Sequence, residues 1–302
     1  MVEVRRTVLD RLGEQLFDRL QAGYMKKDPI QAEASGRRLG RFLFRLDKKH
    51  RKRTISNLKL AFPEWSEAKR LQTAQSVFEH FGIVAGDFMR TPSRTDTEVF
   101  EHMEVEGLEN FELAQGPGKG ILVITAHLGN WERFAQWVRA SGREISVVAR
   151  DANQRGVQLR VSRIREATGV RLLSRGDSAK EILLRLRNDE IVGLLPDQND
   201  DECFVPFFGH PAGTVLGPAI LHRRTGASLL PSYCVRTGPG TYKMVVLPPL
   251  NLDRAIKDPV EIMALVNATL EAEIRKYPEQ WLWMHDRWKN ARNRGLIGAT
   301  EA

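Results

Sequence analysis

The chain has 302 residues, of which 42% are hydrophobic and 28% charged, so it can bury a full core as one large domain or two small ones. Its two cysteines, Cys203 and Cys234, are too few for a disulfide framework or a cysteine-ligated metal cluster, and we expect a reducing, cytosolic environment. No stretch approaches the roughly 20 apolar residues of a transmembrane helix, and the charged N-terminus lacks the apolar region of a signal peptide. A protein of this composition that works on lipid is expected to bind the membrane surface.

The formal net charge of +8 resides in the N-terminal fifth of the chain. Residues 1–60 hold 16 Lys and Arg against 7 Asp and Glu, whereas the rest of the chain has a net charge of −1. In the densest part, residues 37–53, leucines and phenylalanines are interleaved with arginines and lysines. On a helix this pattern is typical of segments that bind an anionic membrane or an acidic protein. A solvated basic face is the alternative, and without a reader motif or a basic stripe elsewhere we predict no nucleic-acid partner.

Residues 1 to about 115 have the spacing of helices. Leu12, Leu16 and Leu20 mark one apolar face of the first helix. Ser66 can cap a later helix, whose Phe, Val and Met side chains are expected in the core.

From about residue 119 the pattern changes to alternating strands and helices. The expected strands span residues 121–125, 144–150, 170–173, 191–197, 228–235 and 242–247. The expected helices span residues 131–140, 155–169, 179–187, 214–225 and 258–277. This alternation predicts an α/β fold with a mixed, largely parallel central sheet flanked by helices. We therefore divide the chain into a basic helical N-terminal region (1–115), an α/β core (116–294) and a loose tail (295–302).

The run ILVITAHLGNWE, residues 121–132, holds two candidate catalytic residues. His127 ends a short β-type run and Glu132 follows five positions later, where a strand should give way to a helix at the carboxyl edge of the sheet. A neutral His can take a proton from a hydroxyl, and a carboxylate on its other ring nitrogen would fix the tautomer. The pair suits acyl transfer to an alcohol, although a lone His at a strand end is more often a satisfied polar residue.

Three further features have two interpretations each. The hairpin FVPFFGHPAG, residues 204–213, is either the wall of a hydrophobic channel or a loop packed on the core. Most arginines in the helix at 155–169 are expected to be solvated charges, and at most one or two to grip a phosphate or an oxyanion; Arg160 and Arg163 share a face, and Arg165 points elsewhere. The tryptophans of residues 277–289 suit either a membrane interface or, as we prefer, packing on the sheet.

These segments occur together, and in one order, in a known family: the chain resembles the bacterial lipid A late acyltransferases, which include lauroyl and myristoyl transferases. The matching segments are RTISNLKLAFPEWS (53–66), ITAHLGNWE (124–132), VVAR (147–150), RIREATG (163–169), LLPDQ (194–198), FVPFFGHPAGT (204–214), RRTGA (223–227) and PEQWLWMHDRWK (278–289). Each is weak to moderate alone, but as an ordered set over residues 36 to 290 they are specific.

The resemblance implies a glycerolipid-acyltransferase-like sandwich and an enzyme at the cytoplasmic face of the inner membrane. Such an enzyme would move a fatty acyl group from the thioester of acyl carrier protein to a hydroxyl of a lipid A precursor, with no metal or other cofactor. His127 matches the family's general base, Glu132 its orienting carboxylate, and Asn57 an asparagine that we expect to be structural. The positions expected to bind substrate are Asn130, Arg150, Arg163, Asp197 and Gln198.

Members of the family usually begin with an apolar membrane segment, which this sequence does not show. We therefore expect a peripheral enzyme held on the membrane by its basic, amphipathic N-terminal region. The alternatives are an acyltransferase that uses acyl-CoA or another glycolipid or glycerolipid acceptor, and a non-catalytic membrane-binding protein of the same fold. No G-x-S-x-G motif supports a serine hydrolase.

Overall fold

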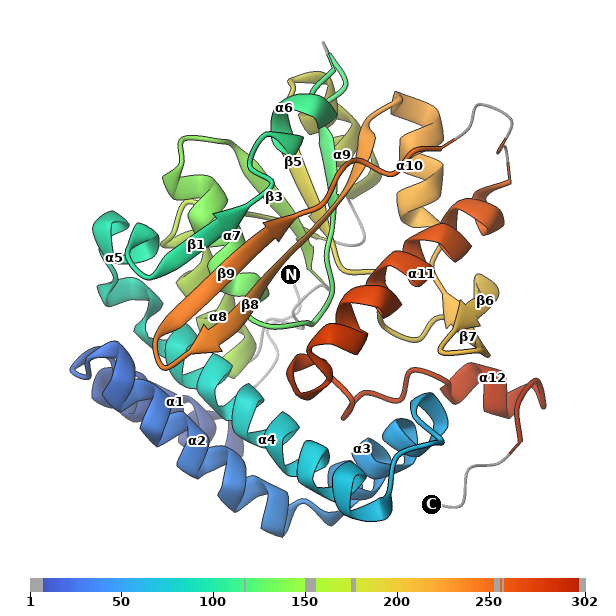
Figure 1. Ribbon diagram of the computed structural model, residues 1–302. Helices are drawn as coiled ribbons and strands as arrows, with labels where there is room; N and C mark the ends of the chain where they lie inside the picture. The colour runs from blue at the N-terminus through green and yellow to red at the C-terminus, as the bar shows by residue number, and fades with distance from the viewer. Residues whose placement is uncertain are drawn as a thin grey trace.

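A seven-stranded sheet forms the centre of the molecule (Figure 1). The computed structural model describes residues 8–116, 118–149, 156–174, 178–252, 256 and 258–298. In spatial order the strands are β1 (Met103–Glu106), β9 (Thr241–Val246), β8 (Ser228–Gly238), β2 (Ile121–Ile124), β5 (Ile191–Leu194), β3 (Ile145–Ala149) and β4 (Arg171–Ser174). Neighbouring strands are parallel, apart from the antiparallel pair β8 and β9. The predicted mixed, largely parallel sheet is confirmed.

Helices cover both faces of this sheet (Figure 1). They are α5 (Asp96–Phe100), α6 (Asn110–Ala114), α7 (Trp131–Ala140), α8 (Val157–Glu166), α9 (Ser178–Arg187), α10 (Gly217–Thr225) and α11 (Pro259–Lys276). Along β2, Ile121 and Val123 pack with α5, α6 and α7, whereas Leu122 and Ile124 pack with α9, α10 and α11. Because both faces are buried, the strand is a continuous apolar run rather than an alternating one.

Four N-terminal helices lie outside this core: α1 (Val8–Met25), α2 (Pro29–Leu46), α3 (Lys48–Ala61) and α4 (Glu67–Arg90). The hydroxyl of Ser66 accepts a hydrogen bond from the backbone N–H of Lys69 at 3.2 Å, as predicted for the cap of α4. Helices α2 and α4 cross so closely at Gly36, Gly40 and Gly82 that a Cβ on any of them would overlap the backbone of the other helix. Helix α2 is therefore packed tightly against α4, which in turn packs on the core.

Strand β1 corrects the prediction of a wholly helical segment up to residue 115. Its sequence, MEVE, has alternating burial: Met103 and Val105 pack against the core, whereas Glu104 and Glu106 are exposed beside Lys243. A four-residue edge strand between short helices is too brief for its period of two to be distinguished in the sequence.

The remaining elements support the loop that follows β5. They are the hairpin strands β6 (Cys203–Phe207) and β7 (His210–Thr214), the short helix α12 (Lys289–Asn293) and the turn η2 (Pro278–Gln280). Phe207 and Phe208 are buried against Trp281, Trp283 and Trp288. Packing on the core is thus the correct interpretation of both the hairpin and the tryptophans. Helix α10 begins later than predicted, because residues 210–214 form β7.

Candidate active site

The site is built on the turn that follows β2 at the carboxyl edge of the sheet. Gly129 has φ +63°, and a Cβ there would overlap the carbonyl of Cys234 on β8, so this position requires glycine. The carbonyl of Gly129 accepts a hydrogen bond from His80 Nε2 of α4 at 3.0 Å. Burial lowers the pKa of His80 to about 4, so this ring is neutral and donates. The turn is therefore anchored by both the sheet and the N-terminal helices.

His127 is paired with Asp197, not with Glu132. Its ring Nδ1 lies 2.9 Å from Asp197 Oδ1, and its backbone N–H donates to Asp197 Oδ2 at 2.8 Å. The indole N–H of Trp281 donates to the same Oδ2 at 2.9 Å. Burial raises the pKa of Asp197, but the charge of His127 and these three hydrogen bonds outweigh it and lower the pKa to about 2. A carboxylate that stays ionised thus holds the ring with Nε2 turned away from it.

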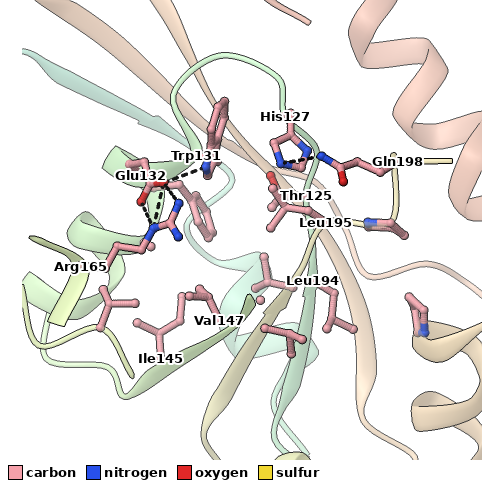
Figure 2. Close-up of a pocket in the computed structure, with 18 of the residues that line it drawn as sticks. Thr125, His127, Trp131, Glu132, Ile145, Val147, Arg165, Leu194, Leu195 and Gln198 are labelled. Atoms are coloured by element: carbon pink, nitrogen blue, oxygen red, sulfur yellow. Dashed lines mark hydrogen bonds and ion pairs between the residues drawn. The ribbon is translucent and has the colours of Figure 1, made fainter. Parts of the chain in front are cut away.

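Glu132 lies across the pocket from this pair, which corrects its predicted role as the carboxylate that orients His127 (Figure 2). Its Oε1 accepts from Trp131 Nε1 and Arg165 Nε, both at 3.0 Å, and Arg165 Nη2 completes the ion pair. Because helix α7 begins at Trp131, Glu132 lies in its first turn, where it contacts α8 rather than the histidine. The spacing of five residues placed both groups at one pocket but not in contact.

The pocket between these groups has a volume of about 550 Å³ and is mostly apolar. Its floor is formed by Val123, Gly193 and Val147, which are register partners on the adjacent strands β2, β5 and β3. Gly193 has no side chain, and a Cβ there would meet Val147 Cγ1 at 3.3 Å. Further apolar lining comes from Phe134, Ile145, Val161, Val170, Ile182 and Leu221. A linear hydrocarbon of moderate length suits such a cavity.

One of the residues predicted to bind substrate lines the pocket, and two others lie outside it. Gln198 is present, with Nε2 3.5 Å from His127 Nε2 (Figure 2). Asp197, also predicted to bind substrate, is buried, contacts the ring of His127 and does not line the cavity. Arg163 is exposed outside the pocket, and Arg165, two residues on and on another face of α8, lies inside it. Arg150 lies outside the described residues.

Asn130, also predicted to bind substrate, is fully buried and structural. Its Oδ1 caps α7 by accepting from the backbone N–H of Arg133, and its Nδ2 donates to Asp87 of α4 at 2.8 Å. Asp87 further accepts hydrogen bonds from Arg94 and Arg133. Burial opposes ionisation of Asp87, but the two arginines hold its pKa well below the usual range. The network connects the active-site turn to α4.

Sequence reasoning missed Asp87, although a carboxylate within the apolar sequence of α4 is itself a signal for a buried partner. Asn57 is structural, as expected: its Nδ2 donates to the carbonyls of Trp283 and His285, both at 2.9 Å. Within the described ranges, no group of three or more His, Cys, Asp or Glu side chains is placed to hold a metal ion. No helix within the same ranges has the length and apolarity needed to cross a bilayer.

Comparison with known proteins assigns the chain to one group. A sequence model described as "Bacterial lipid A biosynthesis acyltransferase" matches residues 29–290. The lipid A biosynthesis lauroyltransferase of Escherichia coli K12 is 29% identical over 257 residues, which is 83% of each chain. A lipid A biosynthesis acyltransferase of Haemophilus influenzae is 26% identical over 82% of this chain and 78% of its own.

Two other relatives have different names. A phosphatidylinositol mannoside acyltransferase of Mycobacterium tuberculosis is 26% identical over 70% of this chain and 68% of its own. A crystal structure of the 1-acyl-sn-glycerophosphate acyltransferase of Thermotoga maritima covers 77% of this chain and 96% of its own, with 12% identity and a TM-score of 0.38. That likeness is too small to carry an argument.

Proposed function

Because the chain belongs to the bacterial lipid A biosynthesis acyltransferase family, we propose that it moves a fatty acyl group from the thioester of acyl carrier protein to a hydroxyl of a lipid A precursor. It is an O-acyltransferase of the late acyltransferase type. The observation that carries the mechanism is the His127–Asp197 pair at the rim of an apolar pocket. The reaction needs no resident metal or other cofactor, since the thioester already makes acyl transfer downhill.

In this mechanism His127 is the general base. Asp197 accepts a hydrogen bond from Nδ1–H, so the Nε2 lone pair is free to take the proton of the acceptor hydroxyl as its oxygen attacks the thioester carbonyl. The ionised Asp197 then stabilises the imidazolium. When the tetrahedral intermediate collapses, the carbon–sulfur bond breaks and the thiolate takes the proton from His127. The ester and the free thiol of the carrier are the products.

The apolar pocket binds the acyl chain of the donor. Its floor of Val123, Gly193 and Val147 extends from below His127 into the space between β3 and α8, so a chain there has its carbonyl carbon near the base. Arg165, held by Glu132 on the opposite wall, is a cation at the pocket. It is suited to a phosphate or carbonyl oxygen of the substrates.

The enzyme is proposed to be peripheral at the cytoplasmic face of the inner membrane. Eight of the sixteen large hydrophobic side chains that are exposed in the described residues belong to α1 and α2, among them Leu12, Leu16, Leu20, Phe42 and Leu46. The excess basic charge lies on α2 and on α3, whereas α1 has two arginines against three acidic residues. Apolar and basic side chains exposed together match an anionic lipid surface.

A second candidate function keeps the chemistry and changes the acceptor. The mannoside acyltransferase of Mycobacterium tuberculosis acts, by its name, on a phosphatidylinositol mannoside, and it matches more than two thirds of this chain. The pocket binds the acyl group in both cases, so another glycolipid acceptor or an acyl-CoA donor is compatible with it.

The test is transfer of labelled acyl groups from acyl carrier protein and CoA thioesters, C10 to C16, to a tetra-acylated lipid A precursor and to phosphatidylinositol mannoside. We expect product from acyl carrier protein donors with the lipid A precursor, and a fall of about 10³-fold in His127→Ala. Product with the mannoside alone would establish the second candidate. Full activity in the variant would disprove the role of His127.

A further inference from the structure

Thr125 lies two residues before His127 in the segment that continues β2. Its backbone N–H donates to the carbonyl of Leu194 at 2.9 Å, so the chain is still extended beside β5 at this point. Side chains two residues apart on an extended chain point to the same face, and Val123, Thr125 and His127 all line the pocket. Figure 2 shows Thr125 between His127 and the apolar floor. Successive side chains of this row are about 6–7 Å apart.

The hydroxyl of Thr125 is buried and unpaired. The residue is 4% exposed, and Oγ1 has no hydrogen-bond partner among the described residues. In the part of the chain that the structure describes, eight buried side-chain polar atoms share this property, and only Thr125 Oγ1 among them belongs to a residue that lines the pocket. A buried hydroxyl without a partner destabilises the fold, whereas valine would fill the same space at no such cost. The position thus indicates a hydrogen bond that is made to a bound molecule.

The chemistry of the row identifies the atom that the hydroxyl contacts. In the proposed reaction the acceptor hydroxyl gives its proton to His127, and a donor on that oxygen would weaken it as a nucleophile. The thioester carbonyl oxygen, by contrast, gains a full negative charge in the transition state and needs donors. With the acyl chain over Val123 and the reacting hydroxyl at His127, the carbonyl group lies between them, beside Thr125.

We propose that the Thr125 hydroxyl donates a hydrogen bond to the carbonyl oxygen of the acyl thioester and stabilises its oxyanion. The inference rests on the proposed function and adds a catalytic residue to it. The acceptor oxygen forms a bond to the carbonyl carbon, the π electrons move to the carbonyl oxygen, and Thr125 Oγ–H donates to that oxygen. Gln198, whose side-chain amide lies beside His127, is placed to supply a second donor. The hydrogen bonds are released when the carbonyl re-forms and the thiolate departs.

The test compares Thr125→Val with Thr125→Ser in the purified full-length enzyme, with one acyl carrier protein thioester as donor. Valine keeps the shape and loses the hydroxyl, so we expect kcat to fall about 100-fold with KM within about threefold. Serine keeps the hydroxyl and should stay within about tenfold of the wild type. The melting temperature of Thr125→Val is expected to equal or exceed that of the wild type, because a buried unpaired hydroxyl is removed.

Thr54→Val is the matched control, since Thr54 is also fully buried but its hydroxyl already donates to the carbonyl of His50 at 2.9 Å. It should lower the melting temperature by a few degrees and leave kcat unchanged. A kcat of Thr125→Val within about threefold of an active wild type would overturn the assignment alone. An equal loss in Thr125→Ser would also overturn it, in favour of a packing role. A folded but inactive wild type would overturn the proposed function and the assignment together.

Discussion

Helices α1 and α2 differ from the α/β core in where their apolar and charged side chains lie. On the two helices Leu12, Leu16 and Leu46 are exposed, and α2 and the following helix α3 carry most of the basic excess of the chain. In the core, by contrast, Asp197 and Arg287 are buried and hydrogen-bonded, and the apolar pocket lies between strands and helices. The first region therefore suits contact with another surface, and the second suits the binding of a substrate. Helix α4 touches both, through its glycine crossing with α2 and through His80.

The largest effect is expected in the core. Asp197→Asn should lower kcat about 10³- to 10⁴-fold and leave vesicle binding unchanged, because an amide in this place favours the wrong tautomer of His127. Trp281→Phe removes only one hydrogen bond to Asp197 and should cost about tenfold or less. The measurements are initial rates and co-sedimentation with vesicles. Activity of Asp197→Asn within tenfold of the wild type would contradict the role of Asp197 in orienting His127.

His80 of α4, which connects the N-terminal helices to the active-site turn, predicts an effect of pH on stability. The pKa of His80 is lowered by burial from 6.5 to about 4, so the unfolded chain binds the extra proton first as the pH falls. The contribution of His80 to the free energy of unfolding is therefore fully present above pH 6.5. It falls by on the order of 3 kcal/mol as the pH drops from 6.5 to 4. His80→Gln keeps a donor for the Gly129 carbonyl but does not titrate. Denaturant unfolding at several pH values should show a flatter curve for the variant, and identical curves would contradict the assignment.

The surface region is tested by changing its leucines. Replacing Leu12, Leu16 and Leu20 together by Gln should weaken binding to anionic vesicles about 100-fold, because partial burial of three leucines in lipid is lost. Transfer to a detergent-solubilised acceptor should be unchanged. The matched control replaces Leu113, Leu184 and Leu296, which are equally exposed but lie outside α1 and α2. Equal vesicle binding by both triple variants would show that the leucines of α1 do not contact the membrane.

The smallest effect concerns the pocket floor. Gly193→Val places a branched side chain against Val147, where even a Cβ is already in close contact, so the longest acyl chains should lose the space they need. We expect preference to shift by about tenfold in kcat/KM toward shorter thioesters in a C10 to C16 series, with vesicle binding unaltered. Gly193→Ala should shift it less. An unchanged chain-length profile would show that the acyl group binds elsewhere.

Much of the architecture was predictable because it depends on local sequence. The alternation of apolar strands and helices predicted the largely parallel sheet, and the end of the apolar run at residues 121–125 correctly placed His127 at its carboxyl edge. Ser66 as the cap of α4 was an equally local signal. The motif order identified the family. The basic charge of residues 1–60 was also read directly from the sequence.

The partners of the site residues were decided only by the tertiary structure. Strands β2 and β5 are neighbours, with Ile124 opposite Leu194, so the residues three positions further on, His127 and Asp197, meet although they are 70 positions apart. Sequence spacing instead favoured Glu132, which is close along the chain but turned toward Arg165 by the start of α7. Strand order and the direction of a side chain from its helix result from the packing of distant segments, and no local pattern encodes them.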